Sequence, residues 1–173
     1  GKMTTANLLF SIAYPDVKNK TEYLFSAIEE VVLSGEKDAG LLIHENRFTY
    51  EKKGLKKIID FGEYWEDKTQ KPIPLGGIMI QRELPEKLKK KVERVIKKSL
   101  LYAYENPAVV LPFIKKHAQE IEEDVLFKHV QLYVNQFTID LKEEGREAIN
   151  VLYESAFNSK LISEIPQKIF LSV

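Results

Sequence analysis

The part of this chain best suited to chemistry is a short apolar run that ends in a histidine. His44 directly follows the apolar residues 41–43, and a cluster of polar and aromatic side chains comes next: Glu45, Asn46, Arg47, Phe48, Thr49 and Tyr50. A short apolar run bounded by polar residues predicts a buried strand. Open α/β sheets bind ligands at the carboxyl ends of such strands, and a histidine there can accept a proton near neutral pH. His44 is therefore the leading candidate for a catalytic base, and a histidine hydrogen-bonded for structural reasons is the alternative.

A second candidate lies near the amino end, where Thr4 and Thr5 precede apolar residues with helical spacing. Threonine is a good helix N-cap because its hydroxyl accepts an otherwise unpaired backbone N–H. A helix start also presents N–H groups and the positive end of the helix dipole, which suit a carboxylate or phosphate. Thr5 and Ala6 are thus candidate ligand contacts, and simple capping of the helix is the alternative.

A third feature is the segment 71–77, which contains two prolines and two glycines. This composition excludes regular structure and predicts a connector with a defined path. Glycine lets a ligand approach the backbone closely. The segment, with Leu75 and Gly76, is therefore either a hinge that lines a cleft or an ordinary loop.

The elements that must position these residues form a mixed front half and a helical back half. We expect a helix over 21–33 that ends at Gly35, strands over 55–61 and 78–81, and a short helical turn over 63–67 that carries Trp65. Pro85 suits the first turn of a long helix, Asn106 and Pro107 interrupt it, and 142–158 form the last clear helix. The division we predict is an α/β part over 1–76 and a part over 77–173 with one strand and mainly helices.

Composition narrows the class of protein. The 173 residues are 44% hydrophobic and 30% charged, which is typical of a soluble globular chain. Because 26 basic and 26 acidic residues cancel, we expect no nucleic-acid partner. We interpret the lysine-rich stretch 87–91 as a solvated helix face. No apolar run is long enough to span a membrane, so we expect no membrane association, and we see no signal peptide.

Several kinds of site are also excluded. The chain has no cysteine, and therefore no disulfide, thiol nucleophile or zinc–thiolate site. The scattered spacing of His44, His117 and His129 predicts no metal site. Glycine-rich phosphate loops, nucleophile elbows and H-E-x-x-H motifs are absent, so redox, kinase and serine-hydrolase functions have no local support.

Five segments together resemble one family. They are Gly1-Lys-Met-Thr-Thr-Ala6, Asp38-Ala-Gly-Leu-Leu-Ile-His-Glu-Asn-Arg-Phe-Thr-Tyr50, Asp60-Phe-Gly-Glu-Tyr-Trp-Glu66, Pro72-Ile-Pro-Leu-Gly-Gly77 and Tyr133-Val-Asn-Gln-Phe137. In this order they resemble the 1,4-dihydroxy-6-naphthoate synthases of the futalosine pathway of menaquinone biosynthesis. The resemblance covers nearly the whole chain, and the strings around His44 and Leu75 are its most specific parts.

The resemblance implies a fold like the two-lobed type II periplasmic binding proteins, with this chain as most of the second lobe plus C-terminal helices that return to the first. It implies a cytoplasmic carbon–carbon lyase that converts cyclic dehypoxanthinylfutalosine, a small-molecule substrate, to 1,4-dihydroxy-6-naphthoate and needs no metal or organic cofactor. The family's catalytic base matches His44. Its substrate contacts match Thr5, Ala6, Leu75 and Gly76.

Family members are considerably longer at the amino end, so the resemblance also implies that this chain is a fragment. We expect such a fragment to be weakly active or inactive alone, and to self-associate through exposed apolar surface. Two alternatives stay open: a non-catalytic solute-binding lobe of the same fold, and a chorismate dehydratase, because a shared fold does not imply a shared function.

Overall fold

The computed structural model describes residues 1–43, 50–118 and 123–171. The chain divides into two compact units. The first comprises Gly1–Leu75 and Glu144–Gln167, and the second comprises Gly76–Glu143 and Lys168–Val173. The expected division, with 1–76 as an incomplete second lobe and 77–173 as a mainly helical part that returns to the first lobe, stays a prediction.

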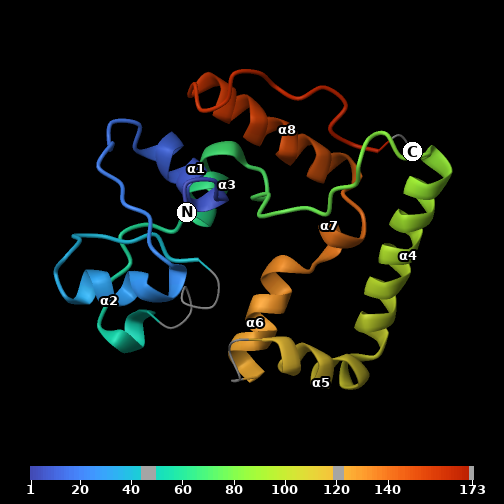
Figure 1. Ribbon diagram of the computed structural model, residues 1–173, viewed down its shortest axis with the longest axis horizontal. Helices are drawn as coiled ribbons and strands as arrows, with labels where there is room; N and C mark the ends of the chain where they lie inside the picture. Colours follow the sequence, from blue (N-terminus) through green and yellow to red (C-terminus); the bar gives the residue numbers. More distant parts are fainter. Residues whose placement is uncertain (44–49, 119–122, 172–173) are drawn as a thin grey trace. The chain divides into compact units, whose positions relative to one another are not determined.

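The core of the first unit forms around two helices that pack side by side, α1 (Thr5–Ala13) and α3 (Phe61–Thr69) (Figure 1). Asp60 starts α3, because its side-chain Oδ1 accepts hydrogen bonds from the N–H groups of Gly62 at 2.7 Å and Glu63 at 3.3 Å. Across the two helices the rings of Phe10 and Phe61 meet edge to face, with centroids 6.1 Å apart. The buried apolar side chains of this unit are Leu9, Trp65, Ala148 and Ala156. The helical turn expected around Trp65 is confirmed, and its tryptophan packs the core.

Short helical elements come before and after residues 44–49 along the chain. The 3₁₀ turn η1 (Phe25–Ala27) leads into α2 (Ile28–Leu33), and η3 (Tyr50–Lys53) follows the segment. The helix expected over 21–33 is therefore shorter than predicted. Its start has no side-chain cap, since neither Leu24 nor Ala27 supplies one. The predicted end is confirmed, because Gly35 has a φ of 77° and its N–H bonds the carbonyl of Val32.

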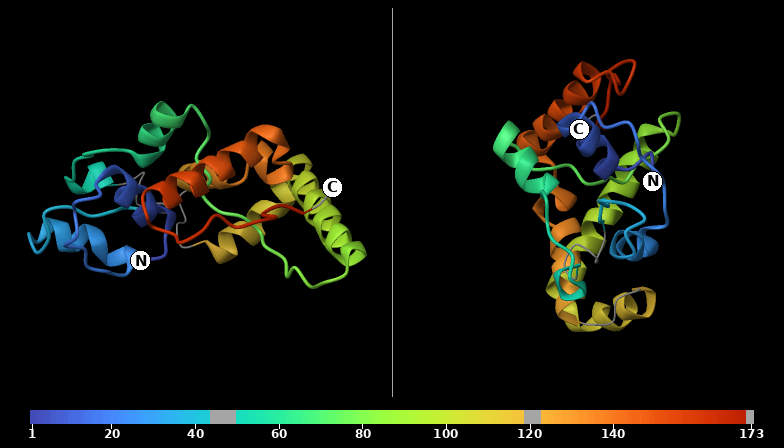
Figure 2. Two further views of the ribbon diagram at one scale, coloured as in Figure 1. Left: turned by 90° about the horizontal axis from the view of Figure 1, so that it is seen from above. Right: turned by 90° about the vertical axis from the view of Figure 1, so that its left-hand side faces the viewer.

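The second unit contains α4 (Glu86–Glu105), α5 (Pro107–His117), α6 (Glu123–Tyr133) and α7 (Gln136–Ile139) (Figures 1 and 2). Pro85 lies just before α4 as its N-cap, and α4 ends at Asn106 as expected. The hydroxyl of Tyr104 donates to the carbonyl of Val134 at 2.7 Å, which ties α4 to the end of α6. Finally, α8 (Lys142–Asn158) begins in this unit and continues into the first; the predicted bounds 142–158 are confirmed.

The lysine-rich stretch is only partly a solvated face. Lys87, Lys90 and Lys91 are exposed on α4, whereas Lys89 is buried. Its ammonium contacts Glu86 at 2.5 Å and donates to the carbonyl of Arg82 at 3.1 Å. Lys89 therefore ties the loop before α4 to the first turn of that helix.

The predicted strands over 41–43, 55–61 and 78–81 are wrong: residues 1–43, 50–118 and 123–171 contain no strand. A strand requires backbone hydrogen bonds to a neighbouring strand, and these apolar runs do not pair. Asp60 instead starts a helix at Phe61, and Ile78 and Met79 lie in solvent, 73% and 93% exposed. The α/β class expected from the sequence is thus not confirmed by the described residues.

Candidate functional site

The first turn of α1 has the geometry of an oxygen-binding helix start. Thr4 is the N-cap, and its hydroxyl accepts from the N–H of Asn7 at 3.2 Å and donates to the carbonyl of Gly1 at 2.8 Å. Thr5 and Ala6 are the first two residues of the helix and are half-buried. Within the described part of the chain their backbone N–H groups have no acceptor. These groups are free to bind an anionic or carbonyl oxygen.

Charged and polar side chains surround this helix start. The carboxylate of Glu22 accepts from the N–H of Lys2 at 2.8 Å, and the amide of Asn7 donates to the carbonyl of Lys2, also at 2.8 Å. The ammonium of Lys20 donates to Oδ1 of Asn7 at 3.2 Å and to the hydroxyl of Ser11 at 2.7 Å. The loop before α1 is thus held to the helix, and a cation lies along its side.

His44, the predicted base, lies outside the described residues, with the other members of its cluster up to Thr49. The residues on both sides of it are described. On the amino side, a Cβ added at Gly40 would lie 2.4 Å from Cγ2 of Ile28 and 3.1 Å from Cγ2 of Val32. The backbone of Gly40 therefore packs directly against α2.

On the carboxyl side, Lys53 of η3 makes an ion pair with Glu29 of α2, with 2.5 Å between Nζ and Oε2. The side chain of Glu29 is only 4% exposed and that of Lys53 is 51% exposed. This pair was not predictable from the sequence, because Glu29 interrupts the apolar pattern of its helix and belongs to no motif. Nearby, burial and then the hydrogen bond to Glu51 raise the pKa of the Tyr50 hydroxyl, which keeps the phenol protonated.

Leu75 and Gly76 lie in the connector where the first unit ends and the second begins. Leu75 is half-buried, whereas Gly76 and Gly77 are exposed, and a Cβ added at either glycine would meet nothing within 4 Å. At the start of the connector Lys71 pairs with Glu147 of α8, and the hydrogen bond to that carboxylate raises the pKa of the lysine. The predicted absence of regular structure over 71–77 is confirmed.

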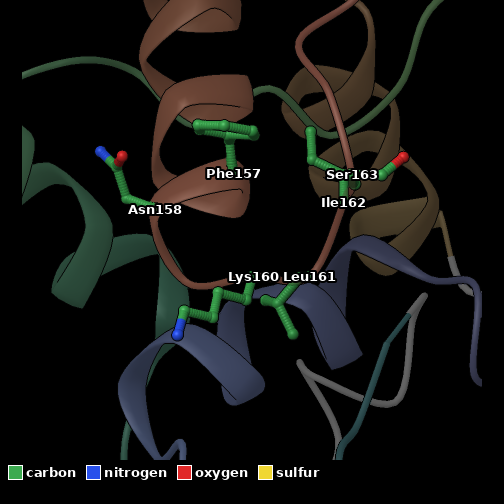
Figure 3. Close-up of a pocket in the computed structure, with 6 residues that line it drawn as sticks. All are labelled: Phe157, Asn158, Lys160, Leu161, Ile162 and Ser163. Carbon is green, nitrogen blue, oxygen red and sulfur yellow. The ribbon is translucent and has the colours of Figure 1, made fainter.

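A surface hollow elsewhere in the first unit contains none of the predicted site residues. Figure 3 shows Phe157 on the last turn of α8 and Ile162 and Ser163 on the segment that follows it. The remaining lining residues are Asn158, Lys160 and Leu161. No cluster of acidic or histidine side chains among the described residues could hold a metal ion. None of the described helices is both long and apolar enough to cross a membrane.

Comparison with known proteins identifies the family. A family model described as menaquinone biosynthesis matches residues 1–158. The chain belongs to this menaquinone biosynthesis family. Two relatives named as 1,4-dihydroxy-6-naphthoate synthases are 37% identical over 171 residues, from Thermus thermophilus, and 41% identical over 138 residues, from Streptomyces coelicolor. These alignments cover 99% and 80% of this chain, but 62% and 49% of the relatives.

A crystal structure of a protein from Archaeoglobus fulgidus matches with a TM-score of 0.87 and 34% identity. The match covers 94% of this chain and 61% of that protein. The helices described above therefore belong to the fold of the menaquinone biosynthesis family. The chain spans roughly half to three fifths of the length of the relatives that it matches.

Proposed function

We propose that this chain forms part of a 1,4-dihydroxy-6-naphthoate synthase that acts in menaquinone biosynthesis. The observation that carries the proposal is the 37% identity to the Thermus thermophilus enzyme over 99% of this chain. The 41% identity to the Streptomyces coelicolor enzyme and the family model over 1–158 support it independently. A solute-binding lobe and a chorismate dehydratase have no comparable support.

The reaction we propose is the lyase step in which cyclic dehypoxanthinylfutalosine loses a proton to His44 and a carbon–carbon bond then breaks to release 1,4-dihydroxy-6-naphthoate. An imidazole has a pKa near neutrality and can accept that proton at physiological pH. Thr5 and Ala6 support the proposal physically, because a helix start with two N–H groups that have no acceptor among the described residues can bind a carbonyl or carboxylate oxygen of the substrate. Leu75 and Gly76 would contact the substrate from the connector. The chemistry assigned to these side chains needs no metal or organic cofactor.

We propose further that the two compact units are parts of the lobes of a type II periplasmic-binding-protein-like fold, in a cytoplasmic enzyme. The surface of the second unit supports packing against additional protein, because large apolar side chains on α4 and α5 lie in solvent. Val95, Val109 and Phe113 are 56%, 62% and 68% exposed. Surface of this kind favours burial against another segment or a second copy of the chain.

The test is turnover by the whole protein as it occurs in its organism. Cyclic dehypoxanthinylfutalosine and chorismate are supplied separately, and the products are followed by absorbance. We expect conversion of the first compound only. His44→Asn should bind it but lower kcat by about 10²- to 10⁴-fold, the usual contribution of a positioned base. The matched control is His117→Asn, because His117 is exposed at the end of α5. Turnover of His44→Asn near that of this control would refute the role of His44.

A further inference from the structure

The long helix α4 (Figure 1) exposes an apolar stripe beside the face that is protected within its unit. The buried and half-buried residues of the protected face are Lys89, Ile96, Leu100 and Ala103. On the neighbouring face, Leu88 and Tyr102 are 43% and 53% exposed, and Val95 between them is exposed as well. The apolar residues of α4 are therefore more than its own unit covers.

The stripe has the spacing of a helix–helix contact. Leu88, Val95 and Tyr102 are seven residues apart, and Val92 and Ser99 lie between them, so the five side chains follow one another at alternating intervals of four and three residues. This alternation is that of the a and d positions of a heptad repeat, the line along which one helix packs against another. Single apolar side chains on a protein surface are ordinary, but scattered residues do not form such a repeat.

Lysines border this stripe on its solvent side. Lys91 and Lys98 occupy the g position of the same repeat, one in each heptad, and both are exposed. Neither pairs with a carboxylate in the described part of the chain, whereas Lys89 and Lys97 of the same helix do. Charges at the e and g positions determine which helix can pair with another. The two unpaired ammonium groups therefore favour a partner with carboxylates opposite them.

Two other occupants suit this surface less well. In an antiparallel pair with a second copy, Lys91 of one copy would lie close to Lys98 of the other, and like charges repel. In a parallel pair the g positions face e positions, and the e positions of α4 are Lys89, Ile96 and Ala103 on the protected face. A bilayer surface binds a helix through a broad apolar face, whereas this stripe is a narrow line.

We propose that α4 is a docking surface for one amphipathic helix of another protein, with apolar residues at its a and d positions and Glu or Asp opposite Lys91 and Lys98. Leu88, Val95 and Tyr102 supply the apolar contacts, and the two lysines select the acidic partner and fix its register. Two heptads bury a small area, so the contact is weak and reversible, as small transient interfaces are.

The test is the binding of synthetic peptides to the whole protein as it occurs in its organism. The acidic peptide has three heptads with leucine at a and d and glutamate at e and g, and its glutamates repel one another, which disfavours pairing with itself. The matched basic peptide has lysine in place of each glutamate. Fluorescence anisotropy of the labelled peptides gives the dissociation constants. We expect the acidic peptide to bind at least about tenfold more tightly than the basic one, and less tightly as the ionic strength rises.

Variants of α4 locate the contact. Val95→Asp places a charge in the middle of the apolar stripe and should lower the affinity for the acidic peptide by about tenfold or more. Leu101→Asp is its matched control, because Leu101 is 40% exposed on a different face of α4, and it should bind as the wild type does. Lys91→Glu combined with Lys98→Glu should reverse the preference in favour of the basic peptide. Lys90→Glu, at an exposed position away from the stripe, should leave the preference unchanged.

Equal affinities of the wild type for the two peptides would overturn the inference, as would an equal loss of affinity in Val95→Asp and Leu101→Asp. If Val95→Asp does not fold by circular dichroism, an unchanged preference in the double lysine variant overturns it equally. No binding of the acidic peptide would also overturn it, and sedimentation then shows whether a second copy occupies the surface. Binding to phosphatidylserine vesicles without binding to the peptide would assign the surface to a membrane instead.

Discussion

A methyl group at Gly40 should destabilise the first unit, because the space that it would occupy is taken by α2. Carbon atoms of neighbouring side chains normally lie 3.5–4.0 Å apart. In Gly40→Ala the new Cβ would start 2.4 Å from Cγ2 of Ile28 and 3.1 Å from Cγ2 of Val32. Either the backbone at residue 40 moves away from α2 by about 1 Å, or Ile28 leaves its rotamer, which is stiff in a helix because the side chain is β-branched.

Two contributions of opposite sign determine how much Gly40→Ala changes the free energy of unfolding. Overpacking of this kind costs about 1–3 kcal/mol. Replacing glycine by alanine also restricts the conformations of the unfolded chain, which stabilises the folded state by about 0.4–1 kcal/mol. Gly40 does not have the positive φ that would add backbone strain to the substitution. The net expectation is a loss of about 1–2 kcal/mol in the free energy of unfolding.

The assay is urea denaturation followed by fluorescence. Trp65 is the only tryptophan of the chain and is fully buried in the same unit as Gly40, so its emission reports on the relevant part. The midpoint should fall while the slope with urea stays constant. Ile28→Ala removes the clashing methyl, so the cost of Gly40→Ala should nearly vanish in that background. Ile28→Val keeps a Cγ2 and should not relieve it. An unchanged urea midpoint in Gly40→Ala would refute the packing argument. So would an equal reduction of the cost of Gly40→Ala in the Ile28→Ala and Ile28→Val backgrounds.

Two other substitutions probe the caps of the helices. Thr4→Ala should lower the free energy of unfolding, measured by urea denaturation, by about 1 kcal/mol, because the N–H of Asn7 loses its acceptor. Thr4→Ser keeps a hydroxyl and should stay close to the wild type. Equal stability of all three proteins would contradict the capping role. The hydrogen bond from the N–H of Lys142 lowers the pKa of Asp140, and the hydrogen bond from the ammonium of Lys97 lowers it further. The ionised Asp140 therefore stabilises the folded protein fully above its ordinary pKa near 3.8, and this contribution is lost as the pH falls through the lower pKa of the folded state. Asp140→Asn should therefore weaken the decrease in Tm on acidification below pH 4, as measured by circular dichroism, and an unchanged decrease would contradict the assignment.

Local features were predictable wherever a few neighbouring residues decide the conformation. The start of α1 at Thr4, the end of α2 at Gly35 and the interruption at Asn106 depend on side-chain caps, a positive φ and a missing N–H, all of which are properties of residue type. The buried Trp65 followed from its large apolar ring. The family followed from strings of residues along the chain, and the family model confirms it.

Strands and the buried ion pair were not predictable in the same way. An apolar run such as 78–81 becomes a strand only if another strand pairs with it, and that partner lies far away in sequence. Glu29 and Lys53 carry no local signal that they meet, because residues 24 positions apart are brought together by the turns between them.

The sequence by itself determined the start of α1, the end of α2, the interruption at Asn106 and the family to which the chain belongs, and it predicts His44 as the side chain for acid–base chemistry. These depend on the types and spacing of residues close to one another. Only the tertiary structure decided that the backbone of Gly40 packs against α2 and that the ammonium of Lys53 pairs with the buried carboxylate of Glu29 on the same helix. The physical reason is that burial and ion pairing depend on distances between remote residues, which are set when the whole unit packs.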